Sequence, residues 1–366
     1  MPSRPVPLVR GGAPAFTRPG ARAYYTEPLF ANAHARPGER AATSRWWPPR
    51  IRATSIGGMV QRNRGIGIPE LRRAFAAGRN IMELLRDARG AAQNDERDIL
   101  CSYDLQAGSY VASLANPHFA EIKRKTGQKL GELFASLGAS VVCEAGVGEG
   151  TTLAEVVASS EDVQEFLGFD ISLSRLLHAR RHLASRGADR VRLFTGALGA
   201  IPLPDESVDL VYTFHSVEPN GGREREVLEE LLRVARRHLV LVEPSNELGS
   251  DETRAHIEEH RFVKDLRAVL EQMGARVVRF EPWGLDANPC NQAALIVVEK
   301  DASRSGDAPR PALASPVSRQ PLVARGGALY SEEDGLAFPV VAGIPCLLVD
   351  NGIVATQLAD LVADGA

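Results

Sequence analysis

The stretch Ser140-Val-Val-Cys-Glu-Ala-Gly-Val-Gly-Glu-Gly-Thr-Thr152 decides the fold class. An apolar strand ends at the acid Glu144 and runs into a turn with Gly146, Gly148 and Gly150 at alternate positions. Glycine has no Cβ and readily adopts positive φ, so such a turn lets a ligand approach the backbone closely. The stretch predicts a ligand-binding turn between a strand and a helix, although a lone motif of this kind also occurs in ordinary tight turns.

A second apolar segment, Glu165–Asp170, also ends in an acid. An acid at the tip of the next strand is placed to bind ribose hydroxyls. The glycines follow G-x-G-x-G spacing, whereas dinucleotide sites use G-x-G-x-x-G. Glu144 would repel a pyrophosphate, but it suits a ligand that carries an ammonium and a sulfonium group. These residues favour S-adenosylmethionine as the ligand.

The pattern continues with a short strand at 191–194, then Thr195-Gly-Ala-Leu198, then Ile201-Pro-Leu-Pro-Asp-Glu-Ser-Val-Asp-Leu-Val-Tyr212. In order and spacing these segments closely resemble class I S-adenosylmethionine-dependent methyltransferases, whose motifs read (D/E)xGxGxG, a second acid, and lPxxdxsfDlV. The resemblance implies S-adenosylmethionine as cofactor. It also implies an α/β fold with a doubly wound, Rossmann-like seven-stranded sheet.

The resemblance further implies roles for individual residues. Glu144 and the three glycines would line the methionine and ribose parts of the cofactor, and Asp170 would bind the ribose hydroxyls. Ala197 and Leu198 would lie beside the adenine. Gly196 stands where many members have an acid, so backbone and packing would recognise the base. The remaining positions expected to line the cofactor are Thr151, Ile171 and Phe214.

Composition indicates a globular protein with ample core, since 44% of the 366 residues are hydrophobic and 24% are charged. The net charge of −3 indicates no particular partner, and the arginines of residues 1–60 are scattered, so we expect no nucleic-acid arm there. No apolar run reaches the roughly 18 residues of a membrane span. The cysteines show no C-x-x-C spacing, which favours a reducing compartment and a cytoplasmic location; they are Cys101, Cys143, Cys290 and Cys346.

The chain divides by composition and periodicity into five parts. Residues 1–55 predict an irregular Arg/Pro-rich extension, and 56–115 predict a helical cap. Residues 116–300 alternate strands and helices, which indicates a mostly parallel sheet covered on both faces. Residues 301–312 predict a linker, and 313–366 predict a small β-rich domain.

Within residues 116–300, hydrophobic periodicity locates individual elements. The predicted helices are 117–137, 151–159, 172–186, 223–237 and 261–274. The strands predicted after the motifs above are 239–243, 276–281 and 293–299, of which the last two form an antiparallel hairpin.

The predicted cap contains Tyr103, Asp104, Ala107 and Tyr110 in the order of a YDxxAxxY stretch. This stretch resembles the lid that many class I methyltransferases fold over their cofactor. By that resemblance one of the two tyrosines would reach the methionine carboxylate. The alternative is that both rings only pack the cap onto the sheet.

The tail from Ser315 resembles the small zinc-ribbon proteins that activate RNA and protein methyltransferases. The segment Phe338-Pro-Val-Val-Ala-Gly-Ile-Pro-Cys-Leu-Leu348 fits their pattern well. Ser315 and Ser318 stand where the first cysteine pair would be, and a hydroxyl is a poor zinc ligand compared with a thiolate. We therefore predict a degenerate ribbon without metal, held by its apolar strands. It would dock on the catalytic domain or on a second copy, as in a homodimer.

The residues that follow strand four, Thr213–Asn220, predict the reaction site, because ligands of doubly wound folds bind at the carboxyl edge of the sheet. The segment lacks the Asn/Asp-Pro-Pro-Tyr/Phe of enzymes that methylate base or amide nitrogens. His215 is a candidate general base, or else it packs beside the cofactor. Glu218 would bind an amine or take a proton, or else cap the helix that begins near Arg223.

Two further sets of polar residues are candidate site residues. The segments Glu243–Glu247 and Asn288–Gln292 fall where substrate loops lie in this fold. His256 and His260 share a helical face, but no third patterned ligand accompanies them, so we predict a solvated face and no metal site.

The first functional hypothesis is methyl transfer to an O or N atom of a small molecule or sugar-like group in a capped pocket. The protein would supply alignment and desolvation for an in-line displacement. The second is methylation of a macromolecule (RNA, protein or peptide), and the third is a non-catalytic subunit that only binds the cofactor. Nucleic acid and membrane partners are not expected under the first hypothesis.

Overall fold

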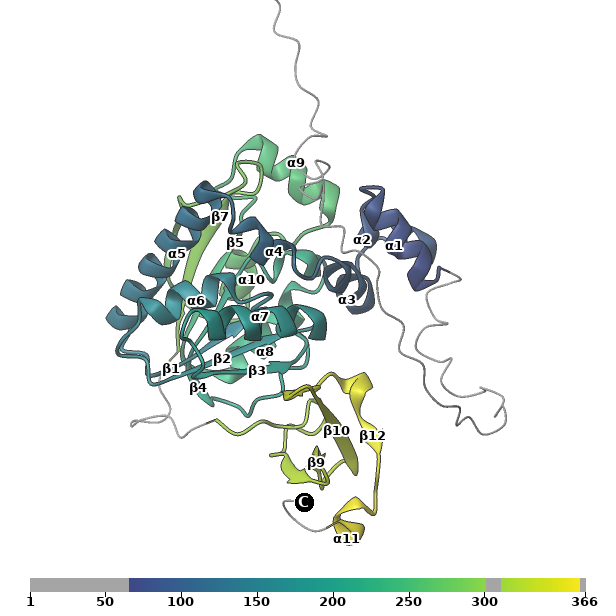
Figure 1. Ribbon diagram of the computed structural model, residues 1–366. Helices are drawn as coiled ribbons and strands as arrows, with labels where there is room; N and C mark the ends of the chain where they lie inside the picture. Colours follow the sequence, from purple (N-terminus) through teal and green to yellow (C-terminus); the bar gives the residue numbers. More distant parts are fainter. Residues whose placement is uncertain (1–65, 301–310, 363–366) are drawn as a thin grey trace, which may run out of the picture.

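The computed structural model describes residues 66–300 and 311–362 (Figure 1). Its centre is a seven-stranded sheet in the order β3-β2-β1-β4-β5-β7-β6. The strands are β1 (Val141–Ala145), β2 (Glu165–Asp170), β3 (Val191–Thr195), β4 (Val208–Phe214), β5 (Ala235–Pro244), β6 (Arg276–Pro282) and β7 (Ala293–Glu299). Neighbours from β3 to β5 pair in parallel, and β7 is antiparallel to β5 and β6. The predicted α/β class and the antiparallel final hairpin are confirmed.

The predicted extension at 1–55, the first part of the predicted cap and most of the predicted linker lie outside the described residues.

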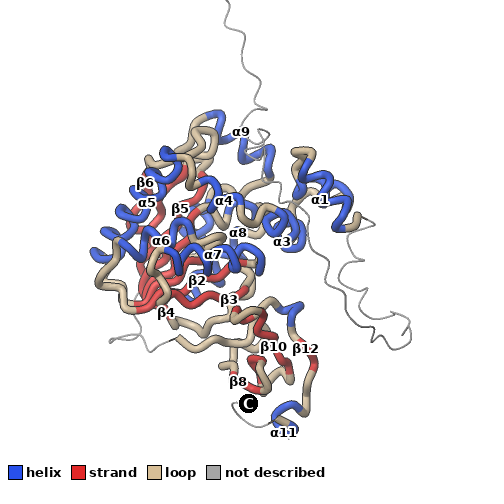
Figure 2. The backbone as a smooth tube through the Cα atoms, viewed as in Figure 1, coloured by secondary structure: helices blue, strands red, loops and turns tan. Residues whose placement is uncertain are grey.

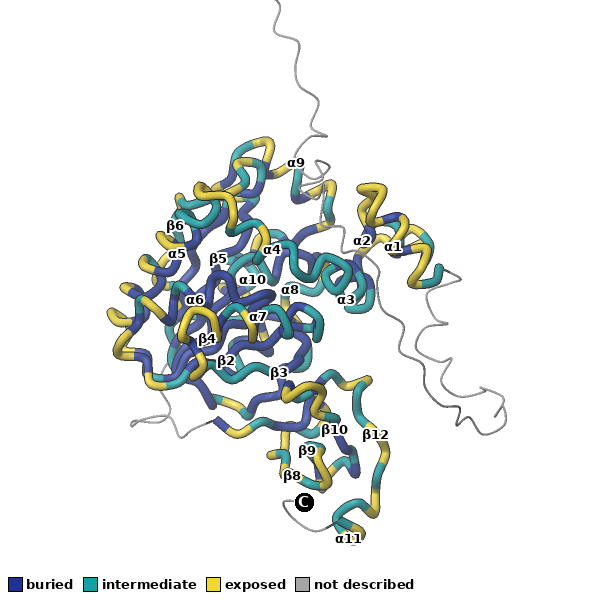
Figure 3. Tube along the Cα trace, in the orientation of Figure 1, coloured by how far each residue is buried: buried dark blue, intermediate teal, exposed yellow. Residues whose placement is uncertain are grey.

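The sheet is apolar on both faces because helices cover both (Figure 3). Successive side chains of a strand point to opposite faces. Val142 packs with the helices α5 (Pro117–Ser136), α6 (Thr151–Ala158) and α7 (Leu173–Ser185). Its neighbour Cys143 packs with α8 (Glu224–Val234) and α10 (Leu266–Gln272). This packing fixes which residues of β1 face each side of the sheet. It thereby fixes the position of Glu144 near the carboxyl end of the strand.

Local signals set the helix ends. Asn116 caps α5 by accepting from the backbone N–H groups of His118 and Phe119, and Ser172 caps α7 by accepting from that of Arg175. The prediction was wrong for 223–237, because the chain leaves the helix at Val234 to pair β5 with β4. It was also wrong for 261–274: α9 (Asp251–His260) ends at Arg261, whose φ is 57°, and α10 starts only at Leu266.

The described part of the cap, residues 66–115, is helical. It comprises α1 (Ile68–Ala76), α2 (Ile81–Arg89), α3 (Glu96–Leu105) and α4 (Ser109–Ser113). The helices α1 and α2 form a small core of their own, built on Leu71, Ala74, Ile81 and Leu85. They lie to one side of the molecule, whereas α3 and α4 lie close to α7 (Figure 1). The cap therefore reaches the sheet mainly through α3, α4 and the loop before α3.

Residues 311–362, the C-terminal unit, form a small antiparallel sheet (Figure 2). Its elements are β8 (Val323–Arg325), β9 (Ala328–Ser331), β10 (Leu336–Val341), β11 (Ile344–Pro345), β12 (Ile353–Val354) and the short helix α11 (Leu358–Leu361). The hydroxyls of Ser315, Ser318 and Ser331 all donate to Asp334 Oδ2, at 2.5, 2.7 and 2.6 Å. A polar cluster thus joins the two turns of this unit, in addition to the apolar strands that the sequence predicted.

The C-terminal unit covers β3, the strand at one end of the main sheet. The backbone N–H of Leu347 donates to Thr195 Oγ1 at 2.7 Å, and Cys346 forms a parallel bridge with Thr195. Phe338 and Leu347 are buried in the core beneath one face of the main sheet. An uncovered edge strand is open to pairing with another chain, so this docking removes an exposed edge.

None of the helices within 66–300 and 311–362 has the length and apolar character needed to cross a membrane.

Candidate active site

The glycine turn takes the conformation for which glycine is needed. Gly146, Gly148 and Gly150 have φ of 77°, 55° and 71°, in the left-handed region that other residues rarely adopt. A Cβ on Gly146 would collide with the side chain of Ser216, whose hydroxyl donates to the carbonyl of Ala145 at 2.6 Å. The turn and the segment after β4 are therefore in direct contact at the carboxyl edge of the sheet.

Asp170 lies at the tip of β2, buried beside this turn. Its Oδ2 accepts from the backbone N–H of Gly148 and its Oδ1 from that of Ser172, each at 2.9 Å. A carboxylate oxygen has two lone pairs, so each oxygen can accept one more hydrogen bond. The half-buried Ile171 lies between Asp170 and Ser172 in the chain.

Glu144 is buried at the tip of β1, where it accepts a 2.6 Å hydrogen bond from the hydroxyl of Tyr212. Burial raises the pKa of Glu144, against the opposing effects of Tyr212 and Lys123. Lys123 on α5 is itself buried, which lowers its pKa. Its Nζ donates to Thr152 Oγ1 at 2.8 Å and lies 4.6 Å from the centre of the Phe214 ring. The charges of Glu144 and Lys123 thus act on one another inside the protein.

The segment predicted to lie beside adenine follows β3. The N–H of Gly196 donates to the carbonyl of Asp170 at 3.1 Å, and a Cβ at Gly196 would come within 2.8 Å of the ring of Pro202. Ala197 is buried and Leu198 is half-buried. The structure thus connects this segment directly to the tip of β2.

A second cluster follows β4. His215 has a φ of 54°, and its Nδ1 lies 3.1 Å from Glu218 Oε2. The amide of Asn291 donates to the same oxygen at 3.1 Å. Below them, Glu243 accepts from the backbone N–H groups of Ser216 and Glu218 at 3.0 and 3.2 Å. These contacts bring together residues from the ends of β4 and β5 and the start of β7.

The charges in this second cluster shift the pKa values of its members. Burial by itself would lower the pKa of His215, but the hydrogen bond and charge of Glu218, with a contribution from Glu243, raise it above its ordinary value. Burial raises the pKa of Glu243 to about 7, against the opposing charge of His215. The His215 side chain is 24% exposed, so a ligand can still reach it.

Glu218 caps no helix, contrary to one sequence-based alternative. It begins a short 3₁₀ segment, Glu218–Asn220, and is buried. The helix α8 starts beyond Arg223, without a side-chain cap.

His256 and His260 are half-buried and not solvated as predicted. Their ring centres lie 4.3 Å apart, and both pack against Phe262. Burial lowers the pKa of each. Across the described ranges, no three or more His, Cys, Asp or Glu side chains are grouped to hold a metal ion.

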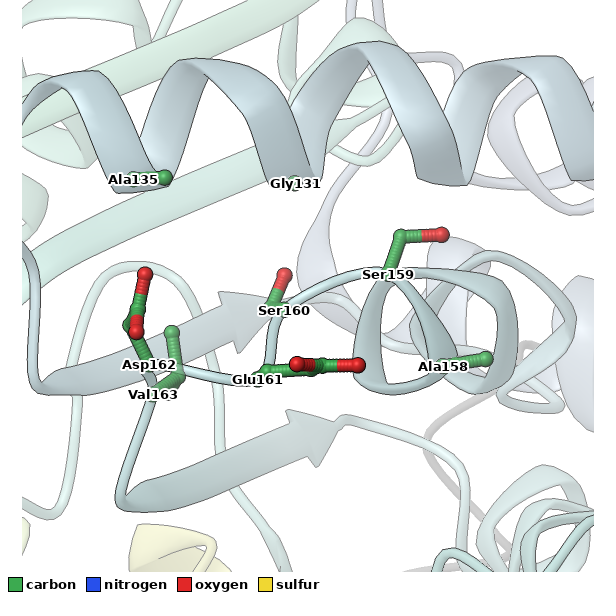
Figure 4. A pocket seen from close by; sticks show the side chains of 8 residues that line it. All are labelled: Gly131, Ala135, Ala158, Ser159, Ser160, Glu161, Asp162 and Val163. Atoms are coloured by element: carbon green, nitrogen blue, oxygen red, sulfur yellow. The ribbon is translucent and has the colours of Figure 1, made fainter.

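Two surface hollows lie away from these clusters. One is lined by the residues in Figure 4, Gly131, Ala135 and the run 158–163, which precedes β2 and so lies at its amino end. The other is lined by residues of α8, β6 and β7, among them Leu232, Arg276 and Glu299. Neither includes a residue of the carboxyl edge.

Comparison with known families agrees with the geometry of this edge. Residues 142–238 match the family model described as a methyltransferase domain. Residues 142–238 form a methyltransferase domain, and the chain is an S-adenosylmethionine-dependent methyltransferase. The matched range begins in β1 and ends in β5, so it contains the glycine turn, Asp170 and His215.

The methyltransferase is also similar to solved structures. One is magnesium protoporphyrin IX methyltransferase from Synechocystis PCC 6803 with bound SAH, at 15% identity and a TM-score of 0.41, covering 64% of this chain and 99% of that one. A SAM-dependent methyltransferase from Aquifex aeolicus has 20% identity and a TM-score of 0.34, covering 48% and 97%. The [4+2]-cyclase SpnF has 18% identity and a TM-score of 0.39, covering 48% and 81%. The comparison with curated proteins finds no match.

The residues at the carboxyl edge fit the cofactor S-adenosylmethionine. The glycine turn allows close approach of a ligand, and Asp170 retains acceptor capacity for ribose hydroxyls. Thr151 begins α6 directly after the turn, and Phe214 ends β4 above Lys123. The assignment of these individual side chains to parts of the cofactor stays a prediction.

Several residues of the methyltransferase site could not be identified from the sequence. Lys123 lies in a helix where a lone lysine is typical of a solvated face, and the sequence places Glu243 in a substrate loop without indicating its contact with the segment after β4. Arg175 lies in the first turn of α7, yet its guanidinium lies 5.0 and 4.9 Å from the ring centres of Tyr103 and Tyr110. No local pattern marks such residues, because their partners lie far away in the chain.

Proposed function

We propose that this methyltransferase transfers a methyl group to a neutral hydroxyl or amine of a small molecule, with His215 as general base. The observation that carries the proposal is the 3.1 Å contact of His215 Nδ1 with Glu218 Oε2, next to the glycine turn. An imidazole that donates from Nδ1 to a carboxylate presents the lone pair of Nε2. It can then take the proton that the acceptor atom loses.

When bound, S-adenosylmethionine supplies a methyl group on a positively charged sulfur, and the carbon–sulfur bond breaks as the acceptor attacks in line. The protein would align the acceptor and exclude water. Ser216, the neighbour of His215, donates a hydrogen bond to the carbonyl of Ala145, and its side chain fills the space that a Cβ on Gly146 would need. These contacts support a base directly beside the cofactor site.

The acceptor class follows from charge. Glu218 and Glu243 lie next to His215 and are buried, so they would repel a carboxylate acceptor. A carboxylate also has no proton to lose. A hydroxyl or an amine needs proton removal, which supports the role of a base.

The size of the acceptor follows from the cap. Glu149, in the glycine turn, accepts from the backbone N–H groups of Gly108 and Val111 at 2.9 and 2.7 Å. Asn94 of the cap donates to the carbonyl of Pro219 at 3.3 Å. These contacts hold the cap over the carboxyl edge, which favours an enclosed small molecule over a macromolecule.

The division of the chain stays part of the proposal: a cap at 56–115, a catalytic domain at 116–300 and a ribbon-like C-terminal domain at 313–366. The cytoplasmic location stays a prediction from the spacing of the cysteines in the sequence. The homodimer stays a prediction from the sequence.

The test is a product assay for S-adenosylhomocysteine with panels of phenols, alcohols, amines and carboxylic acids. We expect turnover with one of the first three classes, and a loss of about a hundredfold or more in His215→Ala. Binding of S-adenosylhomocysteine, measured by calorimetry, should change little in this variant. Preferred methylation of carboxylic acids, or full activity of His215→Ala, would contradict the proposal.

A further inference from the structure

The guanidinium of Arg175 lies among four groups that the sequence assigned to the cofactor. A Cβ on Gly148 would come within 2.5 Å of Arg175 Nη2, so the guanidinium lies directly against this glycine. Arg175 Nη1 is 4.0 Å from Asp170 Oδ2. The rings of Tyr103 and Tyr110 lie against the guanidinium, with their centres 5.0 and 4.9 Å from it.

This arrangement is enclosed and incompletely satisfied. Arg175 is 9% exposed, and its Nε has no hydrogen-bond partner in the ranges that the structure describes. A buried donor without a partner is unfavourable. Arginine has a long side chain with several rotatable bonds, so the guanidinium of Arg175 can leave while α7 stays in place.

A ligand that contacts Gly148, Asp170 and the two tyrosines needs the space that this guanidinium fills. We propose that Arg175 is a gate for the cofactor site: the guanidinium and S-adenosylmethionine compete for the surface of Gly148, and the side chain must swing out before the ribose can reach Asp170. The proposal rests on the cofactor site described above and adds a residue that sets the affinity of that site.

The gate is linked to the cap. Tyr103 lies on α3 and Tyr110 on α4, so each contact of Arg175 with a ring also holds a cap helix against α7. Separate contacts hold the same helices. Asp104 on α3 accepts from the hydroxyl of Ser172 at 2.6 Å, and Glu149 accepts from the backbone N–H groups of Gly108 and Val111, next to and on α4, at 2.9 and 2.7 Å. Removal of Arg175 therefore leaves the cap attached. Departure of the guanidinium would free both tyrosine faces for the ligand.

The experiment compares the wild-type protein with Arg175→Ala and Arg175→Lys, and with Arg181→Ala as an exposed control on the same helix. Calorimetry with S-adenosylhomocysteine gives the affinity, and stopped-flow fluorescence gives the association rate. We expect Arg175→Ala to bind about five- to tenfold more tightly and to associate faster, because no cation–π contacts have to be displaced. Arg175→Lys should fall between, and Arg181→Ala should match the wild type.

Misfolding would weaken binding and not strengthen it, so a gain in affinity by Arg175→Ala cannot come from misfolding. A thermal melt compares the stability of the variants. If Arg175→Ala binds more weakly while Asp170→Ala also binds more weakly, Arg175 is a direct ligand and the gate is overturned. If Arg175→Ala binds S-adenosylhomocysteine and the wild type does not, the gate is supported, because the guanidinium then blocks the site. If neither the wild type nor Arg175→Ala binds S-adenosylhomocysteine, the gate is overturned together with the side-chain assignments of the cofactor site.

Discussion

The hydroxyl of Tyr212 in β4 donates a 2.6 Å hydrogen bond to Glu144 at the tip of β1, and both residues are buried. The two strands are neighbours in the parallel sheet, with Glu144 opposite Tyr212. Glu144, which precedes the glycine turn, is therefore oriented by Tyr212, the last residue of the motif at 201–212.

This contact leads to the first prediction. Tyr212→Phe keeps the ring but removes the hydrogen bond that lowers the pKa of Glu144, so this pKa should rise further above about 8 and the ionised fraction of Glu144 at neutral pH should fall. We expect about three- to tenfold weaker binding of S-adenosylmethionine and a loss of about 1–3 kcal/mol in the free energy of unfolding. Calorimetry and denaturant titration measure the two effects. Unchanged binding would show that the charge of Glu144 does not hold the cofactor.

Asp170 is expected to hold the ribose through the acceptor capacity left on its two oxygens. Asp170→Ala should weaken binding of S-adenosylhomocysteine by about tenfold or more, the loss of a pair of charge-assisted hydrogen bonds. Asp189→Ala, at an exposed position before β3, is the control and should bind as the wild type does. Equal affinity of Asp170→Ala and the control would refute the ribose assignment.

The raised pKa of His215 sets a direction for the pH dependence of turnover. Only the neutral imidazole can take a proton, so kcat should rise as the pH increases through this pKa. Glu218→Gln removes the charge that raises the pKa, and the rise should then move to lower pH by about one unit. A pH profile of kcat for both proteins checks this. A profile that does not move would mean that His215 is not the group that titrates.

The cluster in the C-terminal unit gives a prediction about stability. Burial alone would raise the pKa of Asp334, but hydrogen bonds from Ser315, Ser331 and Ser318 outweigh it and hold this pKa below its ordinary value. A group with a depressed pKa stabilises the fold above its unfolded pKa, and this contribution is lost as the pH falls through the folded one. The C-terminal unit should therefore loosen in acid.

Ser315→Ala should lower the free energy of unfolding by about 1–2 kcal/mol at neutral pH, because a buried hydroxyl and its hydrogen bond are removed. The difference from the wild type should shrink once Asp334 is protonated. Glu333→Ala, at an exposed neighbour of Asp334, is the matched control. Denaturant titrations at neutral and acid pH measure the effect, and equal stability of Ser315→Ala and the control would contradict it.

The C-terminal unit contains a contact that the sequence did not predict. The sequence places Ser315 and Ser318 where a cysteine pair would be, but it does not indicate their partner Asp334. Asp334 lies beyond two strands, and only the pairing of β9 with β10 turns it toward the serines. Helix ends were misjudged for a similar reason, since Ala235 leaves its helical pattern to pair with Val208 across the sheet.

Local patterns in the sequence were sufficient to predict the α/β class and a glycine turn between β1 and α6. It also placed acids at the tips of β1 and β2. These features depend on local periodicity, on glycine's freedom at positive φ and on short spacings along one strand–turn–helix unit. Three features depend on tertiary structure: Lys123 acts electrostatically on Glu144, Asn291 and Glu243 complete the cluster of His215, and Arg175 lies against Gly148. These partners are far apart in the chain and meet because parallel strands deliver their carboxyl ends to one edge of a single sheet.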